Sequence, residues 1–389
     1  MRSNYKPIGE CIRLVDERNT DLRVTKLLGL SISKEFIPSV ANIVGTDMKN
    51  YKIILKNQFA CSTMQVRRDR KMPVALLKDF DEAIISAAYP VFEVIDEESI
   101  LPEYMMMWFT RSEFDREACF YAIGGVRGSI EWEDFCNMKL PVPSIEKQRE
   151  IVKEYHVLVD RINLNNRLIE KLEETAQAIY KHWFVDFEFP DEEGKPYKSN
   201  GGEMVFNEEL DMEIPKGWEV KILSSLSEMK YGKMLKEDDF SDSGFPVYSG
   251  YGIRGFCKQY IYEETQILVI ARGVSGTGEV KMSPPKCYVT NLSIVVEVKK
   301  NLVNKMYLYL YLKNKNLRSL DSGSAQSQIT TNDLNNVSIL IPPIEMQNSA
   351  GNLIEILKEN LDKKNDEINV INKTKDILLS KLATLEDNQ

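Results

Sequence analysis

Two segments of the chain carry apolar residues at alternating steps of four and three, the pattern of a helix that packs along a seam on another helix. The first segment spans residues 151–179 and is interrupted by the polar Asn165. The second spans residues 354–382 and is interrupted at the corresponding place by Lys364. From its second position onward, the first series plus 199 reproduces the second. We therefore predict two equivalent long helices that pack on each other.

The duplication extends upstream of the helices. DFCNMKLPVPSIEKQ (134–148) aligns with DLNNVSILIPPIEMQ (333–347) at the same offset of 199, with six of fifteen positions identical. GGVRGSI (124–130) aligns with GSAQSQI (323–329) in the same register. A repeat of this length indicates that the chain contains one structural unit twice.

The segment before each helix reads differently from the helices. Short β-rich runs such as YKIIL, QILVIA and SIVVEV alternate with Gly, Asn and Ser turns, which predicts mixed α/β blocks with irregular loops. We expect an α+β protein with an internal pseudo-twofold repeat. Its predicted parts are a first block (1–143), a central helix (144–188), an exposed Gly-, Pro- and acid-rich connector (189–216), a second block (217–343) and a C-terminal helix (344–389).

The net charge of −9 opposes nucleic-acid binding only if the acidic residues lie on the binding surface. They are concentrated in the helices and the connector, whereas the block 217–343 has more basic than acidic residues. Phosphate binding depends on where lysine and arginine lie. The charge distribution is compatible with a DNA-binding protein that holds DNA weakly unless partners add contacts.

The cysteines and the apolar runs bear on the compartment. The six cysteines lie far apart and form no CxxC pair, which is typical of reduced thiols. No apolar run approaches the ~20 residues of a membrane span, and the first residues lack the apolar core of a secretion signal. We predict a cytoplasmic protein.

Catalytic motifs are incomplete throughout the sequence. GVSGTGEVK (273–281) lacks the Gly-Lys-Ser/Thr ending of a phosphate loop. The two Pro-Pro pairs lack the flanking residues with which an adenine methyltransferase grips its base. His156 and His182 lie on the predicted helix, where packing or solvent explains them. We predict no catalytic and no metal-binding residue.

Two stretches resemble a known family. LEETAQAIYKHWFVDFEFP (172–190) followed by IPKGWEVKILSSL (214–226) is similar to the central region of type I restriction-modification specificity subunits. Residues 323–347 resemble the closing part of their target-recognition domains. The resemblance implies two target-recognition domains, two antiparallel conserved helices, double-stranded DNA as ligand, two docked methyltransferase subunits and optional restriction subunits. It implies a bacterial or archaeal source and no cofactor in this chain, since S-adenosylmethionine, ATP and Mg²⁺ belong to the partners.

Candidate DNA contacts are side chains able to read base edges or hold phosphates from loops. In the first block they are Gln65, Arg67, Arg68, Arg70, Lys71, Arg127 and Ser129. In the second block they are Tyr248, Tyr251, Arg254, Arg272, Ser275, Thr277, Lys281, Gln326 and Gln328. For each of these residues the alternative is that it merely solvates a turn.

Two further hypotheses concern how the chain would work. One block with a few base contacts would read only about three or four base pairs, and each mismatch in such a site costs ~1–3 kcal/mol. A site this short occurs too often in a genome to be discriminated by one block alone. We therefore expect an asymmetric, bipartite DNA target, with two different half-sites at a fixed spacing. Tyr180, Trp183 and Phe184 exceed what one helical seam can bury, so we expect them to dock the methyltransferase. The alternative is a stand-alone two-domain DNA-binding regulator, which would bind DNA strongly without partners.

Overall fold

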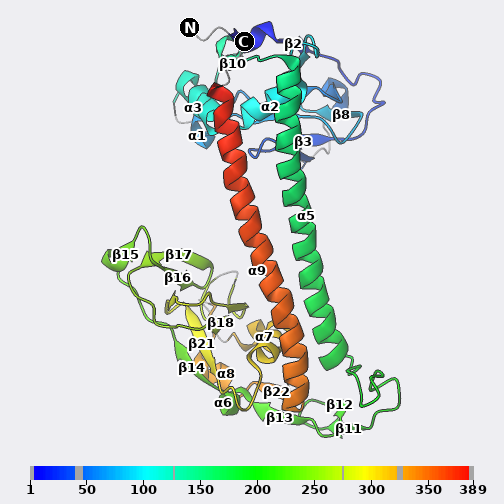
Figure 1. Ribbon diagram of the computed structural model, residues 1–389, viewed down its shortest axis with the longest axis vertical. Helices are drawn as coiled ribbons and strands as arrows, with labels where there is room; N and C mark the ends of the chain where they lie inside the picture. The colour runs from blue at the N-terminus through cyan, green and yellow to red at the C-terminus, as the bar shows by residue number, and fades with distance from the viewer. Residues whose placement is uncertain (1–3, 40–46, 126–127, 274–275, 322–326, 385–389) are drawn as a thin grey trace. The chain divides into compact units, whose positions relative to one another are not determined.

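The structure is a computed structural model that describes residues 4–39, 47–125, 128–273, 276–321 and 327–384. The chain separates into two compact units. Unit 1 comprises residues 1–166 and 365–389, and unit 2 comprises residues 167–364. Helix α5 (Ile145–Phe184) begins in unit 1 and ends in unit 2, and helix α9 (Ile344–Lys381) runs from unit 2 back into unit 1 (Figure 1). The two long helices predicted from the heptad pattern are confirmed.

Unit 1 is built on a four-stranded antiparallel sheet in the order β2-β9-β6-β7. Its strands are β2 (Ile12–Val15), β9 (Val91–Val94), β6 (Phe59–Cys61) and β7 (Val74–Leu76). Three two-stranded sheets join β1 (Tyr5–Pro7) to β10 (Lys139–Pro141), β3 (Leu28–Leu30) to β4 (Phe36–Pro38), and β5 (Lys52–Leu55) to β8 (Glu82–Ile85). The helices before α5 are α1 (Val66–Asp69), α2 (Pro102–Thr110), α3 (Ser112–Tyr121) and α4 (Trp132–Asn137). The core is aromatic: Phe59 stacks on Phe92 at 5.0 Å, and Phe109 meets both rings edge-on.

Unit 2 has the same antiparallel order in its sheet β14-β21-β18-β19. The strands are β14 (Ser227–Tyr231), β21 (Ser293–Val298), β18 (Ile267–Ile270) and β19 (Val280–Met282). A second sheet contains β15 (Phe240–Ser241), β17 (Gly252–Cys257), β16 (Phe245–Ser249) and β20 (Tyr288–Val289). The remaining pairs join β11 (Met204–Asn207) to β12 (Met212–Pro215) and β13 (Glu219–Ile222) to β22 (Ser338–Ile341). Short helices α6 (Leu223–Leu226), α7 (Lys305–Asn314) and α8 (Thr331–Asn335) complete the unit.

The internal repeat is visible in individual hydrogen bonds. The side-chain oxygen of the fully buried Gln148 accepts from the backbone N–H of Leu101 (2.9 Å), just before α2, and its amide donates to the carbonyl of Pro143 (2.8 Å). Gln347, 199 residues later, accepts from the N–H before α7 (2.9 Å) and donates to the carbonyl of Pro342 (2.7 Å). The first turn of α5 in unit 1 and the first turn of α9 in unit 2 are therefore anchored by matching hydrogen bonds.

The long helices pack on each other in opposite chain directions within each unit. In unit 1, Ile151 of α5 shares a core with Leu379, near the end of α9, and with Leu382, which directly follows that helix. In unit 2, Tyr180 near the end of α5 shares a core with Ile354, near the start of α9. Asn165, the polar seam residue, is fully buried, and its side-chain atoms have no hydrogen-bond partner among the residues described. A buried polar seam residue costs stability and fixes register.

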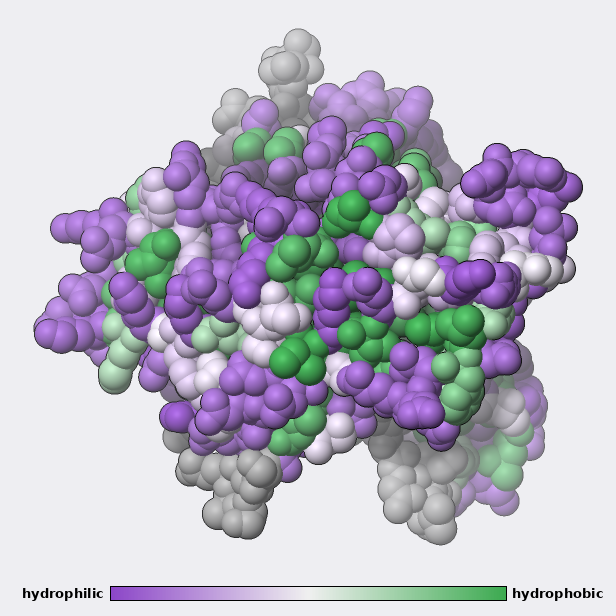
Figure 2. Space-filling view, turned by 90° about the horizontal axis from the view of Figure 1, so that it is seen from below, coloured by the Kyte–Doolittle hydropathy of each residue, from purple (hydrophilic) through white to green (hydrophobic). Residues whose placement is uncertain are grey.

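The connector is more ordered than an exposed loop. After α5 the chain turns at Phe187, which has a φ of +62°. Phe187 and Phe189 both pack on the ring of Trp218. The β11–β12 hairpin follows. Seen from the side on which β11, β12 and β13 lie in Figure 1, apolar patches are surrounded by hydrophilic side chains (Figure 2). No helix in the described part of the chain has the length and apolar composition needed to cross a membrane.

Candidate nucleic-acid interface

In unit 1 the predicted Gln65–Lys71 cluster forms a one-turn helix, α1, with Gln65 and Arg70 in the left-handed region at either end. The backbone N–H of Arg67 donates to the carbonyl of Gly128 (3.4 Å), and its guanidinium donates to the carbonyl of Gly124 (3.3 Å). A Cβ atom at Gly128 would lie only 2.7 Å from that of Arg67. The structure thus brings α1 against Gly124 and Gly128, next to the predicted contact Ser129.

The basic residues of this cluster are not equivalent. The Arg68 guanidinium is held by the neighbouring Asp69 carboxylate, with an Nε–Oδ1 distance of 2.6 Å. This contact holds the pKa of the Asp69 carboxyl below its usual range. Arg67, Arg70 and Lys71 are exposed, and no carboxylate among the described residues forms an ion pair with them. Arg68 is therefore less available to a phosphate than its neighbours.

In unit 2 the loop after β18 contacts two other segments that contain predicted DNA contacts. Arg272 is exposed and forms an isolated antiparallel bridge with Gln328. Gly273, with a φ of +144°, lies against the hydroxyl end of the exposed Tyr251, which belongs to the β16–β17 turn. Gly276 also approaches that ring, since a Cβ there would lie 3.4 Å from a Tyr251 carbon. Tyr251, Arg272 and Gln328 therefore lie on one surface, although they are far apart in sequence.

Other predicted contacts of unit 2 are less available. Thr277 is 2% exposed and its hydroxyl donates to the carbonyl of Gly273 (2.7 Å), so it holds the loop in shape, which argues against a direct contact with DNA. Arg254 is ion-paired with Glu237 (2.7 Å) and stacks over Phe240. Lys281 is ion-paired with Glu279 (3.1 Å).

The remaining predicted contacts divide into two groups. Ser129 and Tyr248 are half-buried; Ser129 exchanges backbone hydrogen bonds with Ile123, and burial raises the pKa of the Tyr248 phenol. Arg127, Ser275 and Gln326 lie outside the described residues.

The assignment of Tyr180 and Phe184 to a partner-docking surface is wrong. Both are at most 5% exposed and belong to the core of unit 2, where Phe184 packs on Tyr307 at a centroid distance of 4.7 Å and on Trp218 at 6.1 Å. Trp183 is half-buried against the same core. These aromatic rings exceed the needs of the seam because the second block of the same chain covers them.

Apolar surface suited to docking lies elsewhere on the long helices. In unit 1 a groove of about 380 Å³ is lined by Val157 and Leu158 of α5 and by Ile377 and Leu378 of α9, among others. Val157 and Ile377 are more than half exposed. In unit 2, Ile356, the counterpart of Val157 at the offset of 199, is also more than half exposed.

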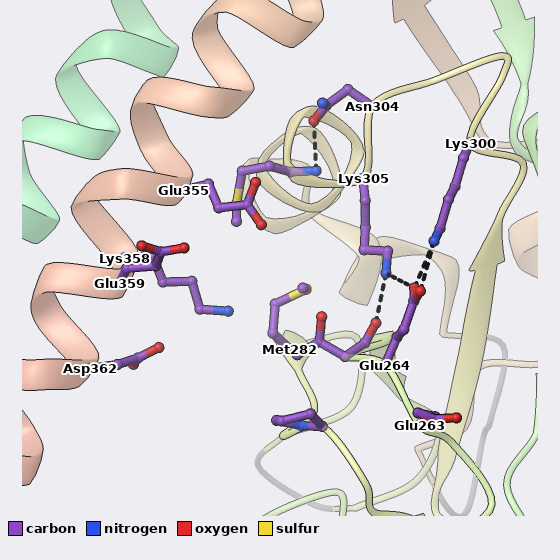
Figure 3. A pocket seen from close by; sticks show the side chains of 13 residues that line it. Glu263, Glu264, Met282, Lys300, Asn304, Lys305, Glu355, Lys358, Glu359 and Asp362 are labelled. Atoms are coloured by element: carbon purple, nitrogen blue, oxygen red, sulfur yellow. Dashed lines mark hydrogen bonds and ion pairs between the residues drawn. The ribbon is translucent and has the colours of Figure 1, made fainter.

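A second pocket, in unit 2, has mixed charge (Figure 3). Lys300 and Lys305 both contact the carboxylate of Glu264, and α9 contributes Glu355 and Lys358. Its volume is about 520 Å³, and its walls carry five carboxylates against three lysines. Burial lowers the pKa of Lys358. An excess of carboxylates repels phosphate, so this pocket does not belong to the candidate DNA surface.

Two residues that the sequence reasoning missed lie on α3, the helix that contacts α1. Arg116 of α3 lines a pocket with Arg67 and Arg70, and Phe120, one helical turn later, is 81% exposed. The available signal was their spacing of four on an amphipathic helix that ends before Gly124. Among the residues described, no group of three or more His, Cys, Asp or Glu side chains is placed to hold a metal ion.

Comparisons with known proteins agree with this architecture. The family model for the type I restriction modification DNA specificity domain matches residues 49–174 and 215–373. The chain is 26% identical over 316 residues to the type I restriction enzyme MjaIX specificity subunit of Methanocaldococcus jannaschii, an alignment that covers 75% of this chain and 70% of that protein. It is 30% identical over 112 residues to the type I restriction enzyme HindI specificity subunit of Haemophilus influenzae, covering 28% and 24%. A crystal structure of the type I restriction-modification S subunit from M. genitalium has the same fold, with a TM-score of 0.63, 18% identity, and coverage of 97% of this chain and 95% of that one. The chain therefore belongs to the family of type I restriction-modification DNA specificity subunits, non-catalytic proteins that assemble with the other subunits and DNA and supply the sequence specificity.

Proposed function

We propose that this chain reads an asymmetric, bipartite DNA target, with one half-site bound by each of its two predicted target-recognition blocks, 1–143 and 217–343. The observation that carries the proposal is that unit 1 and unit 2 have the same arrangement of strands and anchoring hydrogen bonds but present different side chains on their loops. Gln148 and Gln347 make matching hydrogen bonds, and the two central sheets have the same strand order. Yet the loop after β6 presents Arg67 and Arg70, whereas the loop after β18 presents Arg272 near Tyr251.

Different side chains on equivalent scaffolds support different half-sites. Arginine pairs with guanine in the major groove, while glutamine pairs with adenine, so two unlike loops would read unlike sequences. Joining two readers in one chain multiplies their selectivities. Helix α5 is a continuous helix of 40 residues that belongs to both units, so the two blocks are joined by regular secondary structure.

Methylation mapping tests this proposal. The host DNA is sequenced by a method that detects methylated adenine, with and without this gene. The expected result is loss of one split motif whose two halves differ and whose spacer has a fixed length. A continuous or palindromic motif would contradict the bipartite reading. Exchange of residues 217–343 with those of a relative should change only one half of the motif.

The partners are proposed to be two methyltransferase subunits and, in the full enzyme, up to two restriction subunits in the cytoplasm of a bacterium or archaeon. The exposed apolar positions Val157 and Ile356 support a count of two, because they are repeat-related and each unit carries one of them. An exposed apolar patch on a helix surface is typical of a binding site for another protein. Val157 lines the groove that also contains Ile377.

Co-purification tests the stoichiometry. Val157→Asp and Ile356→Asp each place a charge at one exposed apolar position without replacing a buried residue. Each single variant should retain one methyltransferase subunit per chain, and the double variant should retain none, as measured by native mass spectrometry. Val370→Asp, at another exposed apolar position of α9, is the matched control. Two bound methyltransferases in the double variant would refute the docking assignment.

A further inference from the structure

Three arginine side chains converge on one pocket of unit 1. Arg67 lies on α1, Arg70 follows that helix, and Arg116 comes from α3; Cys119 completes the lining. The pocket has a volume of about 310 Å³. Since one water molecule occupies ~30 Å³ in the liquid, there is room for a phosphate group and its hydration.

The positive charge of this pocket is poorly neutralised by the protein. Among the described residues, no carboxylate forms an ion pair with Arg67 or Arg70. Arg116 forms an ion pair with the half-buried Glu113 at 3.4 Å, but Glu113 also contacts Arg111, and an ion pair with an arginine as exposed as Arg116 contributes little. Arginine presents a planar fork of donors that matches phosphate oxygens. The pocket is therefore suited to an anionic ligand.

The backbone that carries these arginines is held in place before any ligand arrives. Val66 of α1 is fully buried, and the Cys119 thiol donates to its carbonyl oxygen (3.4 Å). Behind α3, the buried carboxylate of Asp115 is ion-paired with Lys34 (2.8 Å) and accepts from the N–H of Met72 (3.0 Å). A rigid setting of this kind lowers the entropic cost of binding.

Exposed apolar side chains lie close in sequence to the residues that form the pocket. Phe120 lies one turn after Arg116 on α3, packs edge-on against Tyr121 at 5.4 Å and is 81% exposed. Ile123 follows in the loop and is 69% exposed. Its neighbour Gly124 accepts the hydrogen bond from Arg67. Exposed apolar surface next to a cationic pocket is complementary to a ligand in which an anionic group adjoins an apolar face.

We propose that the pocket of Arg67, Arg70 and Arg116 binds one phosphodiester group of the DNA backbone, and that Phe120 and Ile123 pack against the sugar and base beside it. This inference rests on the proposed function and names the place where unit 1 holds the duplex. DNA offers both features together, because sugars and thymine methyl groups lie next to its phosphates. An anionic lipid surface also combines them and is the alternative that the experiment must separate.

The experiment uses the complex of this chain with its methyltransferase and measures binding to target and unrelated duplexes at several salt concentrations. Arg116→Gln should weaken binding to both duplexes by a similar factor and reduce the slope of log K against log salt by ~1. Phe120→Ala should weaken binding without changing the slope, since it removes no charge. Arg13→Gln is the control, because Arg13 is another exposed arginine of unit 1, and its guanidinium donates to Glu93 (2.7 Å).

Each contrary outcome has a distinct meaning. If Arg116→Gln has the affinity and slope of Arg13→Gln, the phosphate site is refuted; if Phe120→Ala binds like the unaltered complex, the apolar contact is refuted. If Arg116→Gln instead abolishes binding to phosphatidylglycerol vesicles and leaves DNA binding unchanged, the ligand is a lipid and the proposal is overturned. Failure of the unaltered complex to bind any duplex would refute the proposed function itself, and this inference with it.

Discussion

The hydroxyl group of Tyr251 occupies the space that a Cβ atom at Gly273 would need. The two residues belong to different loops of unit 2, and Arg272 directly precedes the glycine. With a φ of +144°, Gly273 also adopts a backbone conformation that other residues avoid. The absence of a side chain at this position therefore decides where an aromatic ring and an arginine of the candidate interface lie.

Gly273→Ala should displace Tyr251 and weaken binding of the complex to its target by about tenfold, the magnitude of one lost specific contact. Gly217→Ala is the matched control, because Gly217 has a φ of +85° but no atom near its missing Cβ. Fluorescence anisotropy with labelled target DNA measures both variants. Equal affinities for the two variants would show that backbone strain alone, and not the position of Tyr251, explains any loss.

Asp115→Ala should destabilise unit 1 by about 3–5 kcal/mol, because it leaves the buried ammonium of Lys34 without its partner. The change is measured as the loss of hydrogen-exchange protection of unit 1 amides at increasing urea concentrations. Asp69→Ala removes a carboxylate from an ion pair at the surface and should change the unfolding free energy far less than Asp115→Ala does. A small effect of Asp115→Ala would mean that water reaches the Lys34 side chain.

Gln148→Met should lower the local stability at the start of α2, because the N–H of Leu101 and the carbonyl of Pro143 lose their buried hydrogen-bond partner. An unsatisfied buried group costs about 1–3 kcal/mol. Hydrogen exchange should accelerate at the start of α2 but not at the start of α7. Gln347→Met should give the reverse pattern. Acceleration at both places in either variant would contradict separate anchoring of the two units.

Phe184→Ala should destabilise unit 2 by about 3–5 kcal/mol, since the ring is packed against Tyr307 and Trp218 in the core. Val157→Asp should leave the unfolding free energy almost unchanged while releasing one methyltransferase. Thermal unfolding of the isolated chain separates the two effects. An unchanged unfolding temperature in Phe184→Ala would contradict the assignment of Phe184 to the core of unit 2.

The stability of unit 1 should fall as the pH rises above about 8.5, the pKa of a thiol in the unfolded chain. Burial raises the pKa of the Cys61 thiol far above that value, so the folded state keeps its proton where the unfolded state loses it. The stabilisation is complete below the unfolded pKa and declines by up to about 1.4 kcal/mol per pH unit above it. Urea titrations between pH 7 and 10 measure the decline, and Cys61→Ala should reduce it. An identical pH dependence in both proteins would contradict this origin.

The sequence by itself determined the duplication, the two long helices, the α+β fold class and the family. Each of these depends on signals that are local or periodic, such as the steps of four and three in residues 151–179 and the repeated Pro-x-Ile-Glu-x-Gln run. Periodicity reports which face of an element is apolar, because a buried face must repeat with the helix or strand. It reports this whatever the neighbouring element is. The boundaries of the two predicted target-recognition blocks remain a prediction.

Only the tertiary structure decided what covers each apolar face and which charges stay free. Phe184 is apolar in any arrangement, but the return of the chain through Trp218 and Tyr307 makes it a core residue and not a docking residue. Likewise, Arg68 and Arg70 look alike in sequence, yet Asp69 engages only the first. Arg116 joins Arg67 because α3 packs on α1. Contacts between distant segments depend on the path of the whole chain, which no local pattern encodes.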